Sequence, residues 1–386
     1  MEAIPYTRHQ ITAEDIEAVS DVLLHGALTQ GSAVPAFEAA FADYVGAPFA
    51  VAVANGTAAL HLAALALGVN SHAKVITTPL TFVASANAVL YCGGSLAFCD
   101  SDPATGLMDL DSLEHMLKQA KPNTYAGVIP VSLAGYPLNL ERLRALADAY
   151  DLWVLHDACH APGAAFLDSK GTWQRVGNAA FEEACTFSLH PAKHIAAGEG
   201  GVITTRSQTL YEKLCLLRTH GISKQPTTTR SARGNWYYEM LALGYNYRFP
   251  DILAALAHSQ LKRAPAGLER RRELAQKYQE ALADLPLLLP QSNPQLIAHA
   301  YHLYIVQTPL RDALYSYLHA ENILVQVHYI PVYWQPYYQQ LGFAPGLCPQ
   351  AESFYQKCLS LPLYPDLSDA QQNHVIQKIR QFFDGK

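Results

Sequence analysis

The chain has 386 residues, of which 50% are hydrophobic and only 16% are charged, and its formal net charge is −6. This length allows a large buried core, and the charge balance, without a dense basic run, excludes an extended nucleic-acid-binding surface. The seven cysteines are scattered and odd in number, which favours reduced thiols in a cytoplasmic protein. No apolar leader is visible, and the apolar run 58–69 is too short to span a bilayer, so we expect no membrane partner.

The first predicted element is an amphipathic helix that begins after Thr12. Thr12 is a suitable N-cap, Asp15 occupies the third helical position, and Ile16 and Val19 follow at helical spacing. The sequence Leu28-Thr29-Gln30-Gly31 predicts the turn that ends this region.

Short apolar segments then alternate with helical segments. Strands are expected near residues 49–54, 74–78, 95–99, 126–132, 153–157, 184–188 and 201–205. Helices are expected near residues 57–67, 82–92, 109–120, 139–150 and 208–217. This alternation predicts an α/β fold with a mostly parallel seven-stranded sheet and helices on both faces. Because the Gly200-Gly201 turn joins the last two strands directly, one of them should run antiparallel to the rest.

The pattern changes at Pro250. A long helix is predicted over 251–284, and strands near 301–307 and 323–328 and helices near 350–358 and 368–383 follow it. The chain is therefore predicted to form a large domain with an N-terminal arm over residues 1–249 and a smaller α+β domain over residues 250–386. Segment 221–243 lacks periodicity and is interpreted as an active-site or dimer loop.

Lys193 is the strongest candidate for a catalytic residue. It follows a predicted strand that ends at Ser188, and a glycine-rich turn leads from it into the next strand. A lysine that forms a Schiff base must be partly desolvated, and a nearby hydroxyl can bind a phosphate group. A solvated surface lysine is the alternative interpretation.

Asp157 ends another predicted buried strand. A carboxylate in this position can pair with a protonated pyridine nitrogen, although it can also simply cap the following turn. His156 and His160 suggest a metal site. They span the break between strand and loop, and no second pair of ligands is evident, so we predict no metal.

Two further segments are candidates for cofactor contacts. At Asn55-Gly56-Thr57 a predicted strand gives way to a helix, whose first N–H groups and the Thr57 hydroxyl can bind an anion. Phe82 can stack on a cofactor ring, and core packing is the alternative. The carboxyl ends of parallel strands meet at one edge of a doubly wound sheet, so Gly56, Asp157 and Ser188 can converge.

Together these segments resemble the sugar aminotransferases of the DegT/DnrJ/EryC1/StrS family, which have the type I fold of enzymes that use pyridoxal phosphate (PLP). The resemblance covers nearly the whole chain and includes Gly244-Tyr245-Asn246-Tyr247-Arg248. It implies that Lys193 forms the Schiff base and that Asp157 holds the pyridine nitrogen. It also implies a phosphate site at Gly56, Thr57 and Ser188, a ring contact from Phe82 and a contact of His160 with the phenolic oxygen.

The same resemblance implies a homodimer with active sites at the interface. Asn246 would reach the phosphate of the partner's cofactor, and a plain turn residue is the alternative. Details such as His160 in place of the family's usual glutamine resemble the branch that makes pseudaminic acid. That branch moves an amino group from L-glutamate to C4 of a UDP-linked 4-keto-6-deoxy-N-acetylhexosamine. The implied substrate contacts are Tyr6, Leu28, Thr29, Gln30, Gly31, Gln326, Val327, His328 and Tyr329.

Three alternatives stay open. The first is an aminotransferase for another nucleotide keto sugar. The second is a nucleotide-binding dehydrogenase, although Ala54-Asn55-Gly56-Thr57-Ala58-Ala59 lacks the glycine-spaced dinucleotide fingerprint. The third is a catalytically silent relative that binds PLP, against which Lys193 together with Asp157 argues. One departure from the family is that Ala196-Ala197 stands where threonines are usual.

Overall fold

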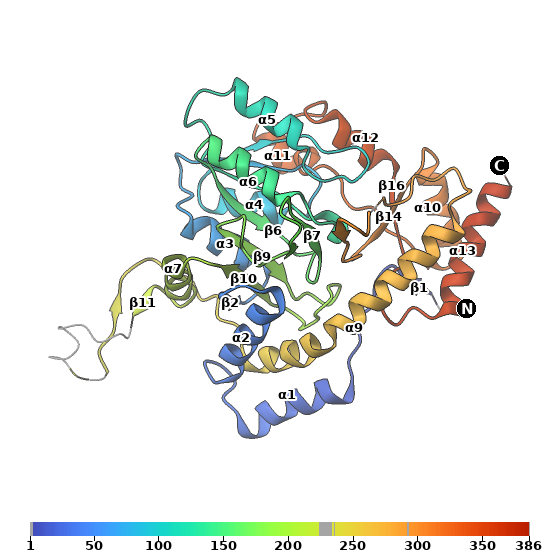
Figure 1. The fold of residues 1–386 in the computed structure, drawn as a ribbon. Coiled ribbons are helices and arrows are strands. Elements are labelled where there is room, and N and C mark those ends of the chain that lie inside the picture. Colours follow the sequence, from blue (N-terminus) through green and yellow to red (C-terminus); the bar gives the residue numbers. More distant parts are fainter. Residues whose placement is uncertain (1–2, 224–233, 235, 292, 386) are drawn as a thin grey trace.

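The computed structural model describes residues 3–223, 234, 236–291 and 293–385. Its centre is a seven-stranded sheet in the order β2-β10-β9-β6-β5-β3-β4 (Figure 1). All seven strands coincide with predicted strands. They are β2 (Phe49–Val53), β3 (Lys74–Thr77), β4 (Ser95–Phe98), β5 (Gly127–Ile129), β6 (Trp153–Asp157), β9 (Ala184–Ser188) and β10 (Gly201–Thr205).

One strand of this sheet runs against the others. β10 pairs antiparallel with β2 and with β9, whereas the pairs from β9 through β6, β5 and β3 to β4 are parallel. This confirms the mostly parallel α/β sheet and the antiparallel strand next to the Gly200-Gly201 turn. Val51, Val154 and Val202 have no exposed surface, as expected for strands that are covered on both faces.

Helices cover the sheet and supply much of its core. Apolar side chains form two large clusters against it, one containing Leu62 from α3 and the other containing Phe37 from α2. The helix α2 was not predicted, whereas the other five were. These helices are α2 (Ala33–Val45), α3 (Gly56–Ala66), α4 (Ala84–Tyr91), α5 (Leu110–Gln119), α6 (Leu140–Ala149) and α7 (Gln208–Arg218).

The N-terminal region reaches two distant parts of the fold. Its strand β1 (Ile4–Pro5) pairs in parallel with β15 (Ile323–Leu324) near the other end of the chain. The helix α1 (Ala13–His25) lies along the long helix α9 (Figure 1). The predicted start of α1 is confirmed, because the backbone N–H of Thr12 donates to Asp15 Oδ2 at 2.9 Å.

The long helix α9 (Asp251–Ala281) connects the two parts of the chain. Its first half packs with α2, and its second half packs in a separate apolar cluster with the C-terminal elements. The division between residues 249 and 250 stays a prediction. The C-terminal elements are β13 (Ile297–Ala298), β14 (Tyr304–Gln307), α10 (Arg311–Ala320), β15, η2 (Val332–Trp334), α11 (Pro336–Gln340), α12 (Pro349–Lys357), β16 (Cys358–Leu361) and α13 (Asp369–Asp384).

Smaller elements complete the fold. A three-stranded sheet in the order β13-β7-β8 uses β7 (Ala165–Leu167) and β8 (Trp173–Arg175). The ends of the predicted loop 221–243 form a hairpin of β11 (Ile222–Ser223) and β12 (Glu239–Met240), while residues 224–233 and 235 lie outside the described residues. A short helical turn, η1, covers Leu133–Gly135. Within the described ranges, every helix is too short or too polar to cross a membrane.

Candidate active site

Lys193 lies in the loop between β9 and β10 and is half-buried. Its amine Nζ lies 3.3 Å from Nε2 of His302. Burial lowers the pKa of Lys193 to about 8, although nearby Cys159 and Asp157 act in the opposite direction. A lysine on an open surface has a pKa of about 10.4 and would stay charged at pH 8. The amine of Lys193 is therefore close to losing its proton under physiological conditions, as a nucleophilic lysine requires.

Asp157 is buried at the end of β6 and is held by two hydrogen bonds. Ser85 Oγ donates to Asp157 Oδ2 at 2.6 Å, and the backbone N–H of Cys159 donates to Oδ1 at 3.1 Å. The second bond is the turn-capping contact that was considered as an alternative. The first bond was not predicted. Because both oxygens are held, the carboxylate has a defined orientation.

Gly56 and Ser188 come together at the carboxyl ends of β2 and β9. A Cβ atom at Gly56 would lie 3.0 Å from Ser188 Cβ and 3.2 Å from Ser188 Oγ. Gly56 and Thr57 are the first residues of α3, and Asn55 caps this helix by accepting from the N–H of Ala58 at 2.8 Å. The free N–H groups of a helix start beside a hydroxyl form a site suited to a phosphate.

Phe82 lies just before α4, the helix that carries Ser85. Its side chain is 60% exposed, so core packing within this chain is excluded. Its position stays compatible with a ring contact.

His160 is buried and lies between two polar partners. The backbone N–H of Ala134 donates to His160 Nδ1 at 3.3 Å, which places the ring proton on Nε2, 3.3 Å from the hydroxyl of Tyr329. Burial, together with the neighbouring Lys193, holds the pKa of His160 well below its ordinary value. His160 is therefore a neutral hydrogen-bonding group.

Tyr6 and His328 meet from opposite ends of the chain. Their ring centroids are 5.3 Å apart, and Tyr329, the next residue, reaches His160. Thr7 Oγ1 donates to the carbonyl of Ala192 at 3.3 Å, beside Lys193. The structure therefore brings these aromatic residues together near Lys193.

Within the described part of the chain, no hydrogen bond joins the other predicted substrate residues to the group of Tyr6, His328 and Tyr329, although Val327 and His328 are neighbours in the sequence. Gln326 is exposed, and its backbone pairs with that of Ser360. Val327 is partly buried. The Leu28–Gly31 turn, which includes Thr29 and Gln30, is bound instead to the start of α9. Gly31 N–H donates to Asp251 Oδ2 at 2.9 Å, and Leu28 O accepts from Asp251 N–H at 3.1 Å. Within the described residues, the hydrogen bonds of this turn do not reach Tyr6 or His328.

Asn246 is exposed on a segment beside β2. The next residue, Tyr247, accepts a hydrogen bond at 2.9 Å from the N–H of Ala54. The segment begins at Gly244, where a Cβ atom would come within 2.1 Å of the backbone nitrogen of Gly221. The backbone here is fixed, and the side chain of Asn246 is open to solvent in the single chain.

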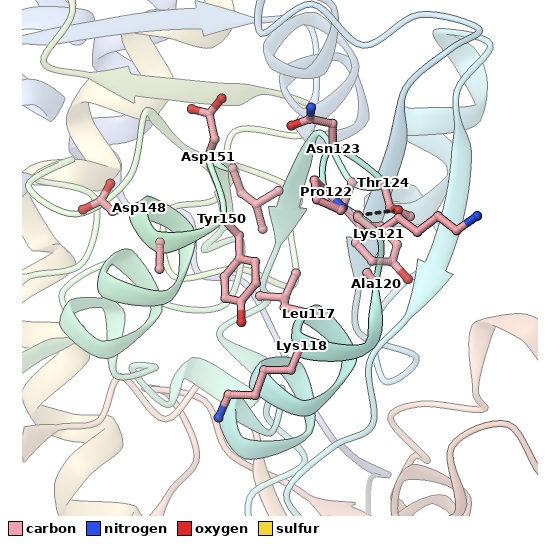
Figure 2. Close-up of a pocket in the computed structure, with 13 residues that line it drawn as sticks. Leu117, Lys118, Ala120, Lys121, Pro122, Asn123, Thr124, Asp148, Tyr150 and Asp151 are labelled. Atoms are coloured by element: carbon pink, nitrogen blue, oxygen red, sulfur yellow. Dashed lines mark hydrogen bonds between the residues drawn. The ribbon is translucent and has the colours of Figure 1, made fainter.

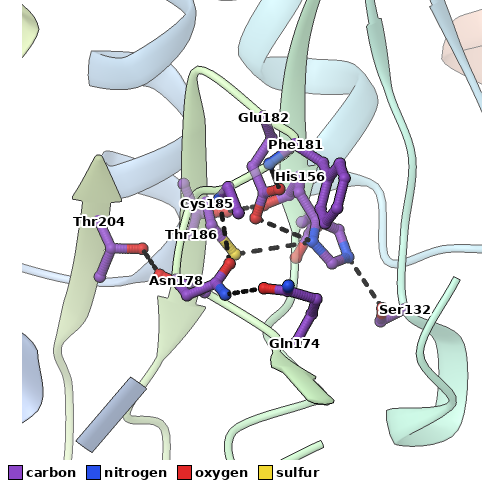
Figure 3. Close-up of polar contacts among 12 residues, drawn as sticks. Ser132, His156, Gln174, Asn178, Phe181, Glu182, Cys185, Thr186 and Thr204 are labelled. Atoms are coloured by element: carbon purple, nitrogen blue, oxygen red, sulfur yellow. Dashed lines mark hydrogen bonds and ion pairs between the residues drawn. The ribbon is translucent and has the colours of Figure 1, made fainter. Parts of the chain in front are cut away.

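The two histidines that suggested a metal site lie in different surroundings. His156 lies in a buried group with Glu182 and Cys185 whose donor atoms are within 4.8 Å of one another (Figure 3). Ser132 Oγ lies 2.8 Å from His156 Nε2, and Cys185 Sγ lies 3.7 Å from His156 Nδ1. Because both ring nitrogens have protein partners, this group is adequately explained as a hydrogen-bonded core cluster.

One hollow near the sheet lies at the opposite end of the strands. Its lining residues include Lys118, Lys121, Tyr125 and Asp151 (Figure 2). These residues precede β5 and β6, whereas Asp157 lies at the far end of β6. The hollow is therefore separate from the cluster around Lys193.

His302 was not predicted from the sequence. Its ring centroid lies 4.3 Å from that of His160 and 5.7 Å from that of His194. It comes from the segment before β14, more than 100 positions after Lys193. No local motif distinguishes it from an ordinary buried histidine, and only the tertiary structure brings it to the lysine.

Comparisons with known proteins agree with this geometry. Residues 9–380 match the DegT/DnrJ/EryC1/StrS aminotransferase family. The chain is 37% identical over 390 residues to the Bacillus subtilis spore coat polysaccharide biosynthesis protein SpsC, covering 99% of this chain and 97% of SpsC. It also resembles Helicobacter pylori PseC, an aminotransferase involved in the biosynthesis of pseudoaminic acid, at 30% identity and a TM-score of 0.88 over 100% of both chains.

A third similar protein is Streptococcus pneumoniae Spr1654, which has been solved in a PMP-form and a PLP-form. The TM-score to its PMP-form is 0.90, with 26% identity and 99% of each chain covered. The residues of the present chain fit PLP as well. Gly56 leaves open a cradle that a Cβ would fill, Lys193 offers an amine with a lowered pKa, and Asp157 is a buried carboxylate.

These matches are inconsistent with the dehydrogenase interpretation and confirm the predicted fold class and cofactor. The chain belongs to the DegT/DnrJ/EryC1/StrS family and is a PLP-dependent sugar aminotransferase.

Proposed function

We propose that this aminotransferase moves an amino group from L-glutamate to C4 of a UDP-linked 4-keto-6-deoxy-N-acetylhexosamine, as in pseudaminic acid biosynthesis. The observation that carries the proposal is the series of contacts from Tyr6 through His328 and Tyr329 to His160. These aromatic and polar side chains suit a sugar ring and lie beside Lys193. The similarity to PseC over its full length supports the same substrate class.

A second candidate is an aminotransferase for a different nucleotide keto sugar. The similarity to SpsC, at 37% identity, favours it, because the name of that protein refers to a spore coat polysaccharide. The two candidates share the chemistry at Lys193 and differ in the sugar that is aminated.

In the proposed mechanism the chain's own residues bind the cofactor and move one proton. When bound, PLP supplies an electron sink that stabilises a carbanion. Asp157, oriented by Ser85, would hold the pyridine nitrogen, and Phe82 would cover the ring. Lys193 would hold the cofactor between turnovers. Its neutral amine would then accept a proton from the substrate carbon and deliver it to the carbon on the other side of the linking nitrogen, which is a 1,3-transfer.

The phosphate would be held by the N–H groups of Gly56 and Thr57 and by the hydroxyl of Ser188. His160 would bind the phenolic oxygen through its Nε2–H, in competition with Tyr329. Because the amine of Lys193 has a pKa of about 8, about a tenth of it is in the proton-accepting form at pH 7, compared with well under a hundredth for an ordinary lysine.

The proposal includes a homodimer with active sites at the interface. The β11-β12 hairpin projects from the body of the chain (Figure 1). In and beside it, Trp236, Met240 and Leu243 are between 60% and 77% exposed. Several exposed apolar side chains gathered on one projecting hairpin are typical of a surface that binds another protein. The open side chain of Asn246 would contact the phosphate of the partner's cofactor.

A cytoplasmic location and the division into domains 1–249 and 250–386 also belong to this proposal. The location is supported by the seven cysteines, all within the described residues, each of which is free.

The substrate is tested by supplying the PLP-loaded enzyme with L-glutamate and a panel of UDP- and dTDP-linked 4-keto sugars. Mass spectrometry and NMR identify the aminated product. We expect an amine at C4 of the UDP-linked N-acetylated 4-keto sugar. Amination of only the other sugars would favour the second candidate, and no amination of any keto sugar would contradict both.

A further inference from the structure

His302 has a fixed position beside Lys193. It is buried, with 3% of its surface exposed. The segment that carries it is bonded to η1, since Ala300 N–H donates to Gly135 O at 2.9 Å and Leu303 N–H donates to Ala134 O at 3.2 Å. Gly135 has a φ of +91°, and a Cβ there would lie 3.1 Å from the backbone nitrogen of His302. The close packing leaves the imidazole little freedom to move.

The two ring nitrogens of His302 have different surroundings. Nε2 faces the amine of Lys193 at 3.3 Å. Nδ1 is buried and has no hydrogen-bond partner within the part of the chain that the structure describes. Because a neutral imidazole carries one proton, the position of that proton is linked to the protonation state of Lys193.

A charged Lys193 would leave an unfavourable arrangement. Its ammonium can only donate, so His302 Nε2 would have to be bare and the ring proton would lie on Nδ1, as a buried donor without an acceptor. A neutral Lys193 instead offers a lone pair to a proton on Nε2, and Nδ1 is then a bare acceptor. Both arrangements leave Nδ1 without a partner. Only the first also places a charged ammonium in a buried site, which costs more than a neutral amine there and so favours the second arrangement.

Both arrangements assume that His302 is neutral rather than a charged imidazolium. Burial lowers the pKa of His302 well below its ordinary value, and the positive charges of Lys193 and Arg271 act in the same direction. His302 is therefore neutral in the range in which Lys193 titrates.

We propose that His302 is a positioning residue that donates its Nε2–H to the neutral amine of Lys193 and so keeps that amine in its proton-accepting form. This inference rests on the proposed function, in which Lys193 transfers the proton. The bond also directs the lone pair of the free amine, since the imidazole is fixed by its backbone contacts.

Other titratable groups lie near Lys193 and His302, and some of them also influence the pKa of Lys193. Asp157 and Cys159 raise the pKa of Lys193, in opposition to burial. His160, His194 and His328 have lowered pKa values and are neutral near pH 8. Arg271 lies on α9 and donates to the carbonyls of Tyr301, His302 and Leu363.

The test measures the pKa of Lys193 in the cofactor-free protein, where activity plays no part. The protein is treated with a trace of an amine-labelling reagent over a series of pH values, and the label on the Lys193 peptide is quantified by mass spectrometry. Labelling of the wild type should be half-maximal near pH 8. In His302→Gln the amide can turn its oxygen to accept from the ammonium, so the midpoint should rise by about one unit, a tenfold change in the protonation constant.

His194→Gln is the matched control, because His194 is a neighbouring, partly buried histidine whose Nε2 contacts the carbonyl of Ala300 rather than Lys193. Its midpoint should stay at the wild-type value. An unchanged midpoint in folded His302→Gln would overturn the inference.

A second measurement needs no variant. In wild-type protein with ¹⁵N-labelled histidine, NMR should show the His302 proton on Nε2 above pH 8, and a proton on Nδ1 at that pH would contradict the proposal. Failure of the proposed function would give a different result. The cofactor would then be found on a lysine other than Lys193, while both measurements on His302 could still succeed.

Discussion

Ser85 and Asp157 are joined by a hydrogen bond of 2.6 Å, from the Ser85 hydroxyl to the Asp157 carboxylate, although they are 72 positions apart in the sequence. Thr81 Oγ1 lies 2.7 Å from the same Ser85 oxygen. Because Ser85 donates to Asp157, Thr81 is the donor to Ser85. This series of hydroxyls starts from the turn before α4 and orients the carboxylate at the end of β6.

Ser85→Ala should lower the turnover rate about tenfold, since a hydrogen bond to a charged group contributes about 1.5–3 kcal/mol. The protein should still fold and bind PLP. Steady-state kinetics with glutamate and the preferred keto sugar measure the effect. Ser316→Ala is a suitable control, because the exposed Ser316 hydroxyl donates only to the carbonyl of Asp312. Equal rates in the two variants would show that Ser85 does not support catalysis.

Asp157→Asn should have a larger effect, with a loss of at least ~10²-fold in turnover, because removing charge stabilisation at a reacting centre costs several kcal/mol. The phosphate site at Gly56 and Ser188 is untouched, so PLP should still bind. Absorbance spectra of the purified variant check cofactor content, and single-turnover kinetics check the rate. A nearly normal rate would mean that another group holds the pyridine nitrogen.

The sheet could be predicted from the sequence because its signals are local. Each central strand is a short apolar run next to a helical segment, and Val51 and Val154 are typical of these buried runs. The helix α2 was missed because Pro35 in its first turn reads as a loop residue, although proline is tolerated there. The strands β7 and β8 have three residues each and depend on pairing with β13 and with each other, which no local pattern predicts.

The proposed contribution of Asn246 to the partner's site is tested by complementation. Lys193→Ala chains and Asn246→Ala chains should each have low activity alone. Mixed dimers should regain activity, because one of their two sites would take Lys193 from one chain and Asn246 from the other. Activity of the mixture is compared with that of each variant under conditions in which subunit exchange is demonstrated by mass. Exchange without any gain in activity would exclude a role of Asn246 across the interface.

The proposed sugar contacts are tested by separating the two half-reactions. Tyr6→Ala and His328→Ala should slow the reaction with the keto sugar, while glutamate should still remove the visible absorbance of the bound cofactor at nearly the wild-type rate. Stopped-flow absorbance measures each half-reaction separately. Equal slowing of both halves would indicate a structural role for these residues, such as support of the packing beside Ser360, which lies 2.8 Å from His328 Nδ1.

Some residues of the candidate site, like some elements of the fold, could be predicted from local sequence patterns, and others could not. Gly56 and Ser188 could be selected because each lies next to a strand end with a recognisable motif, and the structure brings these two residues into contact. Ser85 and His302 could not be selected, because a serine in a helix and a buried histidine are common, and their contacts with Asp157 and Lys193 arise only from the tertiary packing.

The most direct test of the central claim is to identify the lysine that holds PLP. The PLP-loaded enzyme is reduced with borohydride, which fixes the cofactor to the amine that carries it, and the digested protein is analysed by tandem mass spectrometry. We predict a single pyridoxyl-modified peptide with the modification on Lys193, and loss of this product in Lys193→Ala. A modification on another lysine of the wild-type enzyme would contradict the account.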